Sequence, residues 1–502
     1  MRIIGIILAG GLGLGFMFYA GENLRGKAAW TQFKKEWEAK GEVFDYRKVV
    51  PPPVPTEKNF AHTPLLKPLL EHQWNKDFSE ILKDPDPAKV KRANQLMAIK
   101  DRRPEQAGSW RTGRPIDLAP WQQIFRKDAD WPHPKEAGNA AEDILFALKK
   151  HEAEFKELAQ AGQDRPLCRF DIEYRANFSA LLPHLTVLRN VSRGFALRAL
   201  AHLELNQPEQ AWADVRTSLF LGECIRTEPL LISQLVRIAI LEISLQPIWE
   251  GLRTRRWTPD QLKAIERTLA DIDLMEGYRI AILGERDLSL FAIDQLGGKT
   301  GKELAALTGN GGGGFPVQLV PSGWIDQNKK NLAQVHVKYT QRIVDAKARI
   351  IKPALADAMD DHITQFPRNP YHIMAAMLVP AISRVSMRTG FTQSGLDHAR
   401  IACLLELHHL QHNEYPKTLA ELKIALPHDP MSGKAYGYQR SPDQRYRLHS
   451  IGWDQKENGA QPAFQTGSDT LKHEAGDWVW QYNPIPLPSE LKKPEKPDNP
   501  DQ

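Results

Sequence analysis

Cysteine is scarce in this 502-residue sequence, and its spacing excludes two classes of fold. Cys168, Cys224 and Cys403 lie far apart and form no CxxC pair. Such a set predicts neither a disulfide framework nor a zinc site, and it is compatible with any compartment. A chain of this length can instead build two or three domains, each with its own hydrophobic core.

The sequence also lacks a dominant charge. Its 66 basic and 61 acidic residues give a net charge of +5. Nucleic-acid recognition needs clustered Lys and Arg, and here they are spread out, so we expect no nucleic-acid partner. Hydrophobic residues at 42% and charged residues at 25% are ordinary for a globular protein.

No catalytic motif is present. There is no GxSxG, and no cysteine has an obvious histidine partner near it in sequence, although a nucleophile assembled in three dimensions stays open. The run Gly309–Gly314 lacks the GxxxxGK[ST] phosphate-loop pattern, and Phe315-Pro316 prevents a helix from starting after it, so we interpret it as a flexible loop. We therefore name no catalytic and no cofactor-binding residue.

The clearest positive signal is an uncharged run at the N-terminus. Ile3–Ala20 contains no charged residue, and about 18 residues make roughly 27 Å of helix, enough to span a bilayer core. The alternative is a cleaved signal peptide, whose apolar region is usually about 7–15 residues long. Phe18 would then occupy a cleavage position that requires a small residue, so we favour an uncleaved anchor.

The orientation of this anchor follows from conflicting signals. Arg25, Lys27, Lys34 and Lys35 follow the span and argue against export of the body by the positive-inside rule. A very short segment before the span favours export. We expect a single-pass inner-membrane protein with the bulk of the chain in the periplasm. Gly11 and Gly15 also form a GxxxG pair, which can bring two helices together.

The segment after the span is expected to separate the body from the membrane. Trp30, Phe33 and Trp37 at helical spacing predict a juxtamembrane helix, and the proline run 51–55 predicts a stiff polyproline II spacer. Residues 56–135 are rich in Pro and Trp and predict an irregular segment with short helices. Its tryptophans either line a binding groove or fill gaps; they are Trp110, Trp121 and Trp131.

Helical periodicity dominates the middle of the chain. Residues 185–205 and 209–225 predict two helices separated by Asn206-Gln207-Pro208, a pair that resembles one hairpin of the tetratricopeptide type, with Ala199 at a packing position. Residues 228–252 are apolar on most sides and predict a buried central helix. Thr258-Pro259-Asp260 predicts the start of another helix.

The C-terminal part reads as a helix, a turn and two or three short antiparallel strands. The order YP, TLAEL, LPHDPMSGKAYGY, SPDQRYRLHSIGWDQKENG and DWVW resembles the globular head of type II secretion major pseudopilins. The peptidase site that precedes the pseudopilin filament helix is missing, so the resemblance implies a reused head rather than a filament subunit. The whole arrangement also resembles uncharacterised membrane-anchored bacterial proteins, which implies no activity.

Calcium is the one cofactor that the resemblance suggests, because the pseudopilin loop after this strand binds Ca²⁺. The matching residues are Asp454 and Asp477. Calcium needs six to eight oxygens, so one loop must fold back to supply several ligands. The alternative is a polar surface loop with solvated acids. Two other groups could bind a metal but more simply form solvated or packed helix faces: His408 with His412, and Asp360 with His362.

The sequence thus predicts a mainly α protein with a small C-terminal α+β module. The expected parts are an anchor (1–22), a juxtamembrane helix, proline spacer and irregular segment (23–135), a helical domain (136–392), the pseudopilin-like module (393–483) and a disordered Pro-rich tail (484–502). The expected function is an envelope binding or scaffold protein, held in the membrane by residues 3–20, with a protein partner and a possible link to secretion through the head. The alternative is an envelope hydrolase with an unrecognised site in the helical domain.

Overall fold

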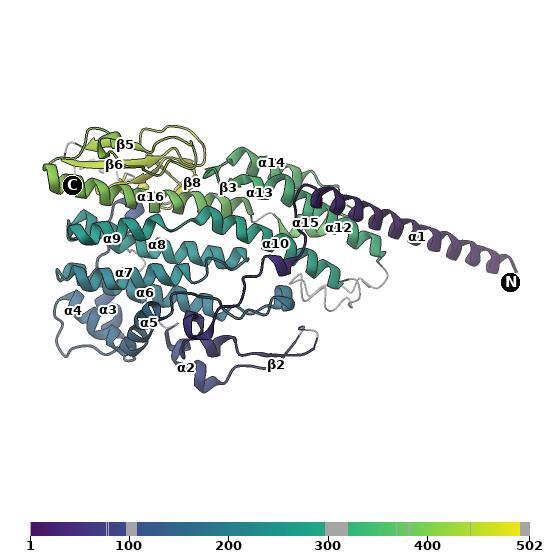
Figure 1. Ribbon diagram of the computed structural model, residues 1–502, viewed down its shortest axis with the longest axis horizontal. Coiled ribbons are helices and arrows are strands. Elements are labelled where there is room, and N and C mark those ends of the chain that lie inside the picture. Colours follow the sequence, from purple (N-terminus) through teal and green to yellow (C-terminus); the bar gives the residue numbers. More distant parts are fainter. Residues whose placement is uncertain are drawn as a thin grey trace, which may run out of the picture.

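The protein is mainly helical with small sheets, and its helices stack in layers with one long helix projecting from the end (Figure 1). The structure, a computed structural model, describes residues 2–491 apart from 77, 79, 97–107, 297–319, 368, 380–381 and 442. The glycine run Gly309–Gly314 therefore lies outside the described residues.

The described helices have the following bounds: α1 (Arg2–Glu38), α2 (Pro87–Gln95), α3 (Ala119–Lys127), α4 (Ala140–Leu148), α5 (Glu152–Asp164), α6 (Pro183–Glu204), α7 (Pro208–Glu223), α8 (Leu231–Arg253), α9 (Pro259–Ala270), α10 (Leu274–Leu296), α12 (Ser322–Val335), α13 (Gln341–Ile343), α14 (Pro353–Thr364), α15 (Ile373–Leu378), α16 (Ile382–His412) and α17 (Pro488–Leu491). The strands are β1 (Gln73–Trp74), β2 (Ile81–Lys83), β3 (Val344–Asp345), β4 (Ile350–Ile351), β5 (Gly437–Ser441), β6 (Arg445–Ser450), β7 (Pro462–Phe464), β8 (Leu471–Gly476) and β9 (Trp478–Trp480).

The predicted hairpin is confirmed as α6 and α7. Asn206 between them adopts a positive φ of 57°, and Pro208 opens α7, where its missing N–H costs nothing. Ala199 and Ala211 are fully buried, as expected where two helices approach. The predicted start of α9 is also confirmed, because Thr258 and Gln261 form a capping box around Pro259.

Helix α8 is the buried central helix that its composition predicts. It is the one described helix that is long and apolar enough to cross a membrane, but 67% of its apolar window is buried inside the protein. Gln234 and Arg237 lie buried on it and are engaged, Arg237 with Glu223 and Gln234 with backbone carbonyls. These contacts identify α8 as a core helix.

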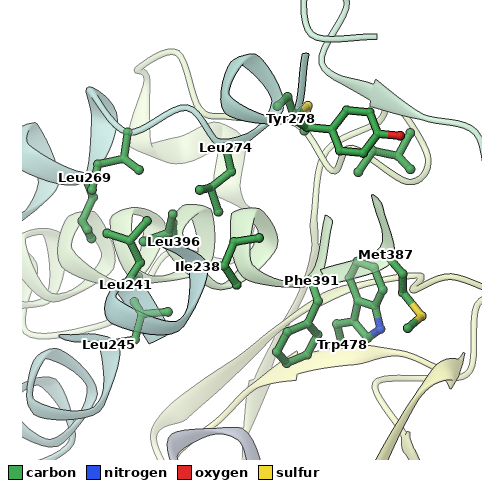
Figure 2. Close-up of a cluster of buried hydrophobic side chains, with 14 of the residues drawn as sticks. Ile238, Leu241, Leu245, Leu269, Leu274, Tyr278, Met387, Phe391, Leu396 and Trp478 are labelled. Atoms are coloured by element: carbon green, nitrogen blue, oxygen red, sulfur yellow. The ribbon is translucent and has the colours of Figure 1, made fainter. Parts of the chain in front are cut away.

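One hydrophobic core joins the helical body to the C-terminal module (Figure 2). It contains Ile238 and Leu245 of α8, Tyr278 of α10, Phe391 of α16 and Trp478 of β9. Helix α16 runs unbroken through residue 393. The boundary expected there therefore falls inside a helix and inside a shared core.

The first described helix is longer than the span predicted for the membrane. α1 continues from the apolar run to Glu38, and Phe33 is buried with Trp30 and Trp37 packed beside it. The proline run does not separate this helix from the body, since Arg169 donates from Nε to the carbonyl of Pro51 at 3.0 Å. The proline run therefore lies against the body instead of holding the body away from α1, and its polyproline II conformation stays a prediction.

The structure also bears on two loop-rich segments: the one with Trp110, Trp121 and Trp131, and the tail from residue 484. Trp110, Trp121 and Trp131 are all buried, so they fill the core rather than line a groove. The tail expected to be disordered from residue 484 is instead held to the body at Ile485 and Glu490. Ile485 is buried and donates its backbone N–H to Thr112, and Arg114 binds Glu490 at 2.7 Å. An apolar side chain and an ion pair hold this stretch despite its prolines.

The C-terminal module has the predicted helix and antiparallel strands. Its three-stranded sheet has the order β5-β6-β9, with Leu448 of β6 opposite Tyr438 and Trp480. A separate β7-β8 hairpin fills the stretch between β6 and β9. The sheet packs on α16 (Figure 1).

Candidate functional site

The loop between β6 and β7 folds back sharply, as a ligand-binding loop would have to. Gly452, Gln455, Gly459 and Ala460 all have positive φ, between 55° and 68°. For Gln455 and Ala460 this is a strained conformation that surrounding contacts must hold. The loop therefore closes around a side chain from outside itself, Asp477.

Asp477 lies just before β9 and is 1% exposed. Its carboxylate accepts the backbone N–H of Asn458 at 3.1 Å and that of Ala460 at 2.7 Å. Burial raises the pKa of Asp477, and the two amides oppose that shift by stabilising the charged form. Asp477 thus organises the loop from below.

Two more side chains converge on this carboxylate. His449 of β6 is 4% exposed, and its Nε2 lies 2.9 Å from Oε1 of Glu457, which also accepts the N–H of Gly459. One ligand atom each from His449, Glu457 and Asp477 lies within 4.8 Å of the others. We call these three residues the C-terminal loop triad.

Asp454, the other residue expected to bind calcium, is not in the triad. Its Oδ1 accepts the N–H of Lys456 at 3.1 Å, and its Oδ2 accepts the N–H of Gly476 at 3.0 Å. These bonds close a turn and tie the loop to the end of β8. Only Asp477 of the expected pair joins the group that could hold an ion.

The donor atoms of the triad decide which cations it fits. Calcium takes six to eight oxygens, whereas the triad offers one imidazole nitrogen beside two carboxylates. Imidazole with carboxylate suits zinc and other first-row divalent ions. Sequence reasoning missed His449 because it lies on a strand, where only its position opposite Gly437 and next to the loop brings it to the acids.

The other predicted metal groups do not assemble. His408 and His412 lie together with ring centroids 4.3 Å apart, but the metal-binding group found among the described residues does not include them. His362 packs between the rings of Tyr339 and Phe366. Both sets form helix faces, the simpler interpretation of their spacing.

Two cavities among the described residues are an open groove and a very small enclosed space. An open groove of about 470 Å³ lies along α4 and includes Glu142 and Asp143, but Asp143 is held by Arg126 at 3.0 Å. A second cavity, beside His473 and Arg111, has a volume of about 10 Å³, room for one water molecule.

A different kind of site is the projecting half of α1. Its apolar side chains are exposed, including Leu12 at 75%, Leu14 at 67% and Phe16 at 76%. Figure 1 shows this half extending away from all other elements. Exposed apolar surface of this extent marks an interaction with a membrane or another apolar partner.

The body holds α1 from Tyr19 onward. The Glu22 carboxylate accepts hydrogen bonds from Trp324 Nε1 and the Tyr371 hydroxyl, both at 2.9 Å, and pairs with Arg25. Tyr19 donates to the carbonyl of Val320 at 3.0 Å.

No protein-family model, curated protein or solved structure matches this chain.

Proposed function

We propose that this protein is a membrane-anchored envelope protein whose helical body binds or scaffolds a protein partner. The carrying observation is the exposed apolar half of α1, beside a second half fixed to the body. Residues 3–20 cross the inner membrane in this proposal, and the body lies in the periplasm. The order of motifs in the C-terminal module, which resembles a pseudopilin head, is the basis for the proposed link to secretion.

The contacts of α1 favour a body that rests close to the bilayer. Tyr19, Trp324 and Tyr371 gather where the helix leaves the body, and aromatic side chains of this kind favour the membrane–water interface. Ile373 and Met377 on neighbouring α15 are 51% and 48% exposed. These side chains would face lipid headgroups in the proposed arrangement.

A binding role has more support than the hydrolase alternative. An enzyme site is recognised by a deep pocket with convergent titratable groups. The cavities described above are open or hold one water, and neither pairs a nucleophile with a base. The hydrolase therefore rests on no specific contact in the described residues.

Membrane fractionation tests the anchor. Wild-type protein should remain in the pellet after alkaline carbonate washing. Gly15→Asp should release or mislocalise it, since a charge at the helix centre costs about 2.5–3.5 kcal/mol on insertion scales. The matched control is Gly21→Asp, which lies outside the span with open space around it. A soluble wild-type protein that begins near Gly21 would overturn the anchor.

Orientation and partner need separate measurements. Protease added to spheroplasts should digest the body, and digestion only in inverted vesicles would contradict the periplasmic orientation. Purification from gently solubilised membranes should then recover the partner with wild-type protein. If the same proteins appear in equal amount with an unrelated single-span protein, the scaffold proposal fails.

Cation binding at the C-terminal loop triad is a second proposal, supported by the convergence of His449, Glu457 and Asp477. The full-length protein, stripped with EDTA, should melt at a higher temperature with zinc, because an ion bound only by the folded state stabilises it. Glu457→Gln should remove that increase, while Glu474→Gln on β8 should keep it.

Calcium distinguishes this proposal from the family expectation. A melting temperature that rises with millimolar calcium, and does so no longer in Asp454→Ala, would support the pseudopilin-type site instead. If neither zinc, calcium nor EDTA changes the melting temperature, His449 and Glu457 form only a structural ion pair.

A further inference from the structure

Two of the scattered cysteines meet in the folded protein. Cys224 is the C-cap residue of α7 and is buried, while Cys168 lies in the irregular stretch after α5 and is half-buried. Cys224 belongs to a hydrophobic core that includes Phe60 and side chains of α6 and α7, and Cys168 packs against the same core. The two side chains are near enough to interact, because after burial the neighbouring Cys168 side chain is the next largest cause of the raised pKa of the Cys224 thiol.

The backbone around Cys168 is fixed independently of this contact. Asn59 donates from its side chain to the carbonyl of Arg169 at 2.8 Å and accepts the N–H of Arg169 at 2.9 Å. On the other side, Phe60 donates its N–H to the carbonyl of Leu167 at 2.7 Å. The residues before and after Cys168 are thus both held by the same dipeptide.

That dipeptide also contacts the helix that carries Cys224. The Phe60 ring meets the Phe220 ring edge to face, with centroids 5.0 Å apart. Phe220 lies one turn before Cys224 on α7 and accepts its N–H at 3.0 Å. Residues 59 and 60 therefore hold the irregular stretch around Cys168 against the end of α7. This packing places the two cysteines near each other.

We propose that Cys168 and Cys224 are a disulfide-forming pair that staples the irregular stretch after α5 to the α6–α7 hairpin. Its oxidation in the cell rests on the proposed periplasmic orientation, because disulfides persist in oxidising compartments and are rare in the cytosol. A zinc site is the competing use of paired cysteines. The metal-binding group found among the described residues contains neither thiol.

The chemistry is thiol–disulfide exchange with a small or protein disulfide as oxidant. The thiolate of Cys168, the more accessible residue, attacks the oxidant's disulfide and releases one thiol. Cys224 then attacks Cys168 Sγ in this mixed disulfide and releases the second thiol. The two cysteines lose two protons and two electrons, and the oxidant gains both as two thiols. Burial raises the pKa of the Cys224 thiol, so the second step should accelerate with rising pH.

Counting free thiols tests the geometry on purified protein. Reduced full-length protein in detergent is treated with oxidised glutathione, denatured, and labelled with a polyethylene-glycol maleimide. We expect one labelled cysteine, the buried Cys403, and three after reduction, since the chain has three cysteines. Peptide mapping should find residues 168 and 224 joined.

Variants make the count specific. Cys168→Ser should leave two labelled cysteines before and after reduction, and Cys403→Ser should leave none before reduction and two after it. Three labelled cysteines in oxidised wild-type protein would overturn the inference. Linkage of Cys403 to either residue would overturn it as well.

Thiol trapping in intact cells separates this inference from the proposed orientation. One labelled cysteine in the membrane fraction supports both. Three labelled cysteines in cells, with one after oxidation of the purified protein, support the pair and contradict the periplasmic body. Three in both experiments overturn the pair alone and leave the orientation to the protease test.

Discussion

Gly26 of α1 lies directly against Gly323 in the first turn of α12, backbone to backbone. A methyl group added to either residue would overlap the main chain of the other helix. By contrast Gly11 and Gly15, the GxxxG pair in the predicted span, have open space around them. The close helix contact made by glycine is therefore inside the body rather than in the span.

This contact predicts that Gly26→Leu loosens α1 from the body. Overpacking of this kind typically costs about 1–3 kcal/mol, and here the obstacle is backbone, which cannot move aside. We expect a lower melting temperature and faster proteolysis near residue 38. Gly21→Leu, on an open face of the same helix, should be neutral, and equal losses in both variants would contradict the packing role of Gly26.

Ala199→Trp should destabilise the α6–α7 hairpin. Ala199 is fully buried between helices, so an indole there has no space, at a cost of about 1–3 kcal/mol or more. The matched control is Ala213→Trp, because Ala213 is exposed on α7. Chemical denaturation of both variants measures the difference, and equal free energies of unfolding would refute the pairing.

The C-terminal module should not fold when it is cut from the body. Trp249 of α8 donates from Nε1 to the carbonyl of Gln481 at 2.9 Å, and Trp110 packs between Phe391 and Trp480. A fragment of residues 390–490 would expose these apolar faces. We expect it to aggregate or to melt without a cooperative transition, whereas sharp melting would show that the module is autonomous.

Acid should destabilise the protein through His398. This buried side chain packs edge-on to Tyr436, and burial lowers its pKa to about 3. Its pKa in the unfolded chain is about 6.5, so the unfolded state binds the proton first as pH falls. The contribution to stability is complete above pH 6.5 and is lost below it, by at most about 1.4 kcal/mol per pH unit.

Urea titrations at pH 7, 6 and 5 measure this dependence. His398→Phe keeps an aromatic ring but cannot titrate, so its stability should fall less with acid than that of wild-type protein. Parallel curves would contradict this role of His398. Asp214, whose pKa burial raises to about 7, acts in the opposite direction, because its folded state binds the proton first as pH falls.

Local signals in the sequence predicted local structure well. Asn206-Gln207-Pro208 ends one helix and starts the next because positive φ and a missing N–H act at those residues themselves. Thr258 was predictable as a cap for the same reason. The helix α8, apolar on most sides, could likewise be identified without knowing its partners.

Long-range contacts could not be predicted in this way. Cys168 and Cys224 lie near each other because Asn59 binds the backbone beside Cys168 and Phe60 packs on Phe220 of α7. Asp477 could be expected from the motif order, but His449 needed the register of β5 and β6 to place it beside the loop. The position of the proline run against the body depends on a hydrogen bond from Arg169, more than a hundred residues away in the sequence.

In the proposed membrane arrangement, the unbroken course of α1 joins the anchor rigidly to the body. A helix of 37 residues is about 55 Å long, and the described α1 has no break between the apolar half and the half that packs on the body. A membrane-spanning helix tilts to match the thickness of its bilayer. A change in lipid thickness would therefore rotate the whole body relative to the membrane plane. The same rotation would change the height above the membrane at which a bound partner is held.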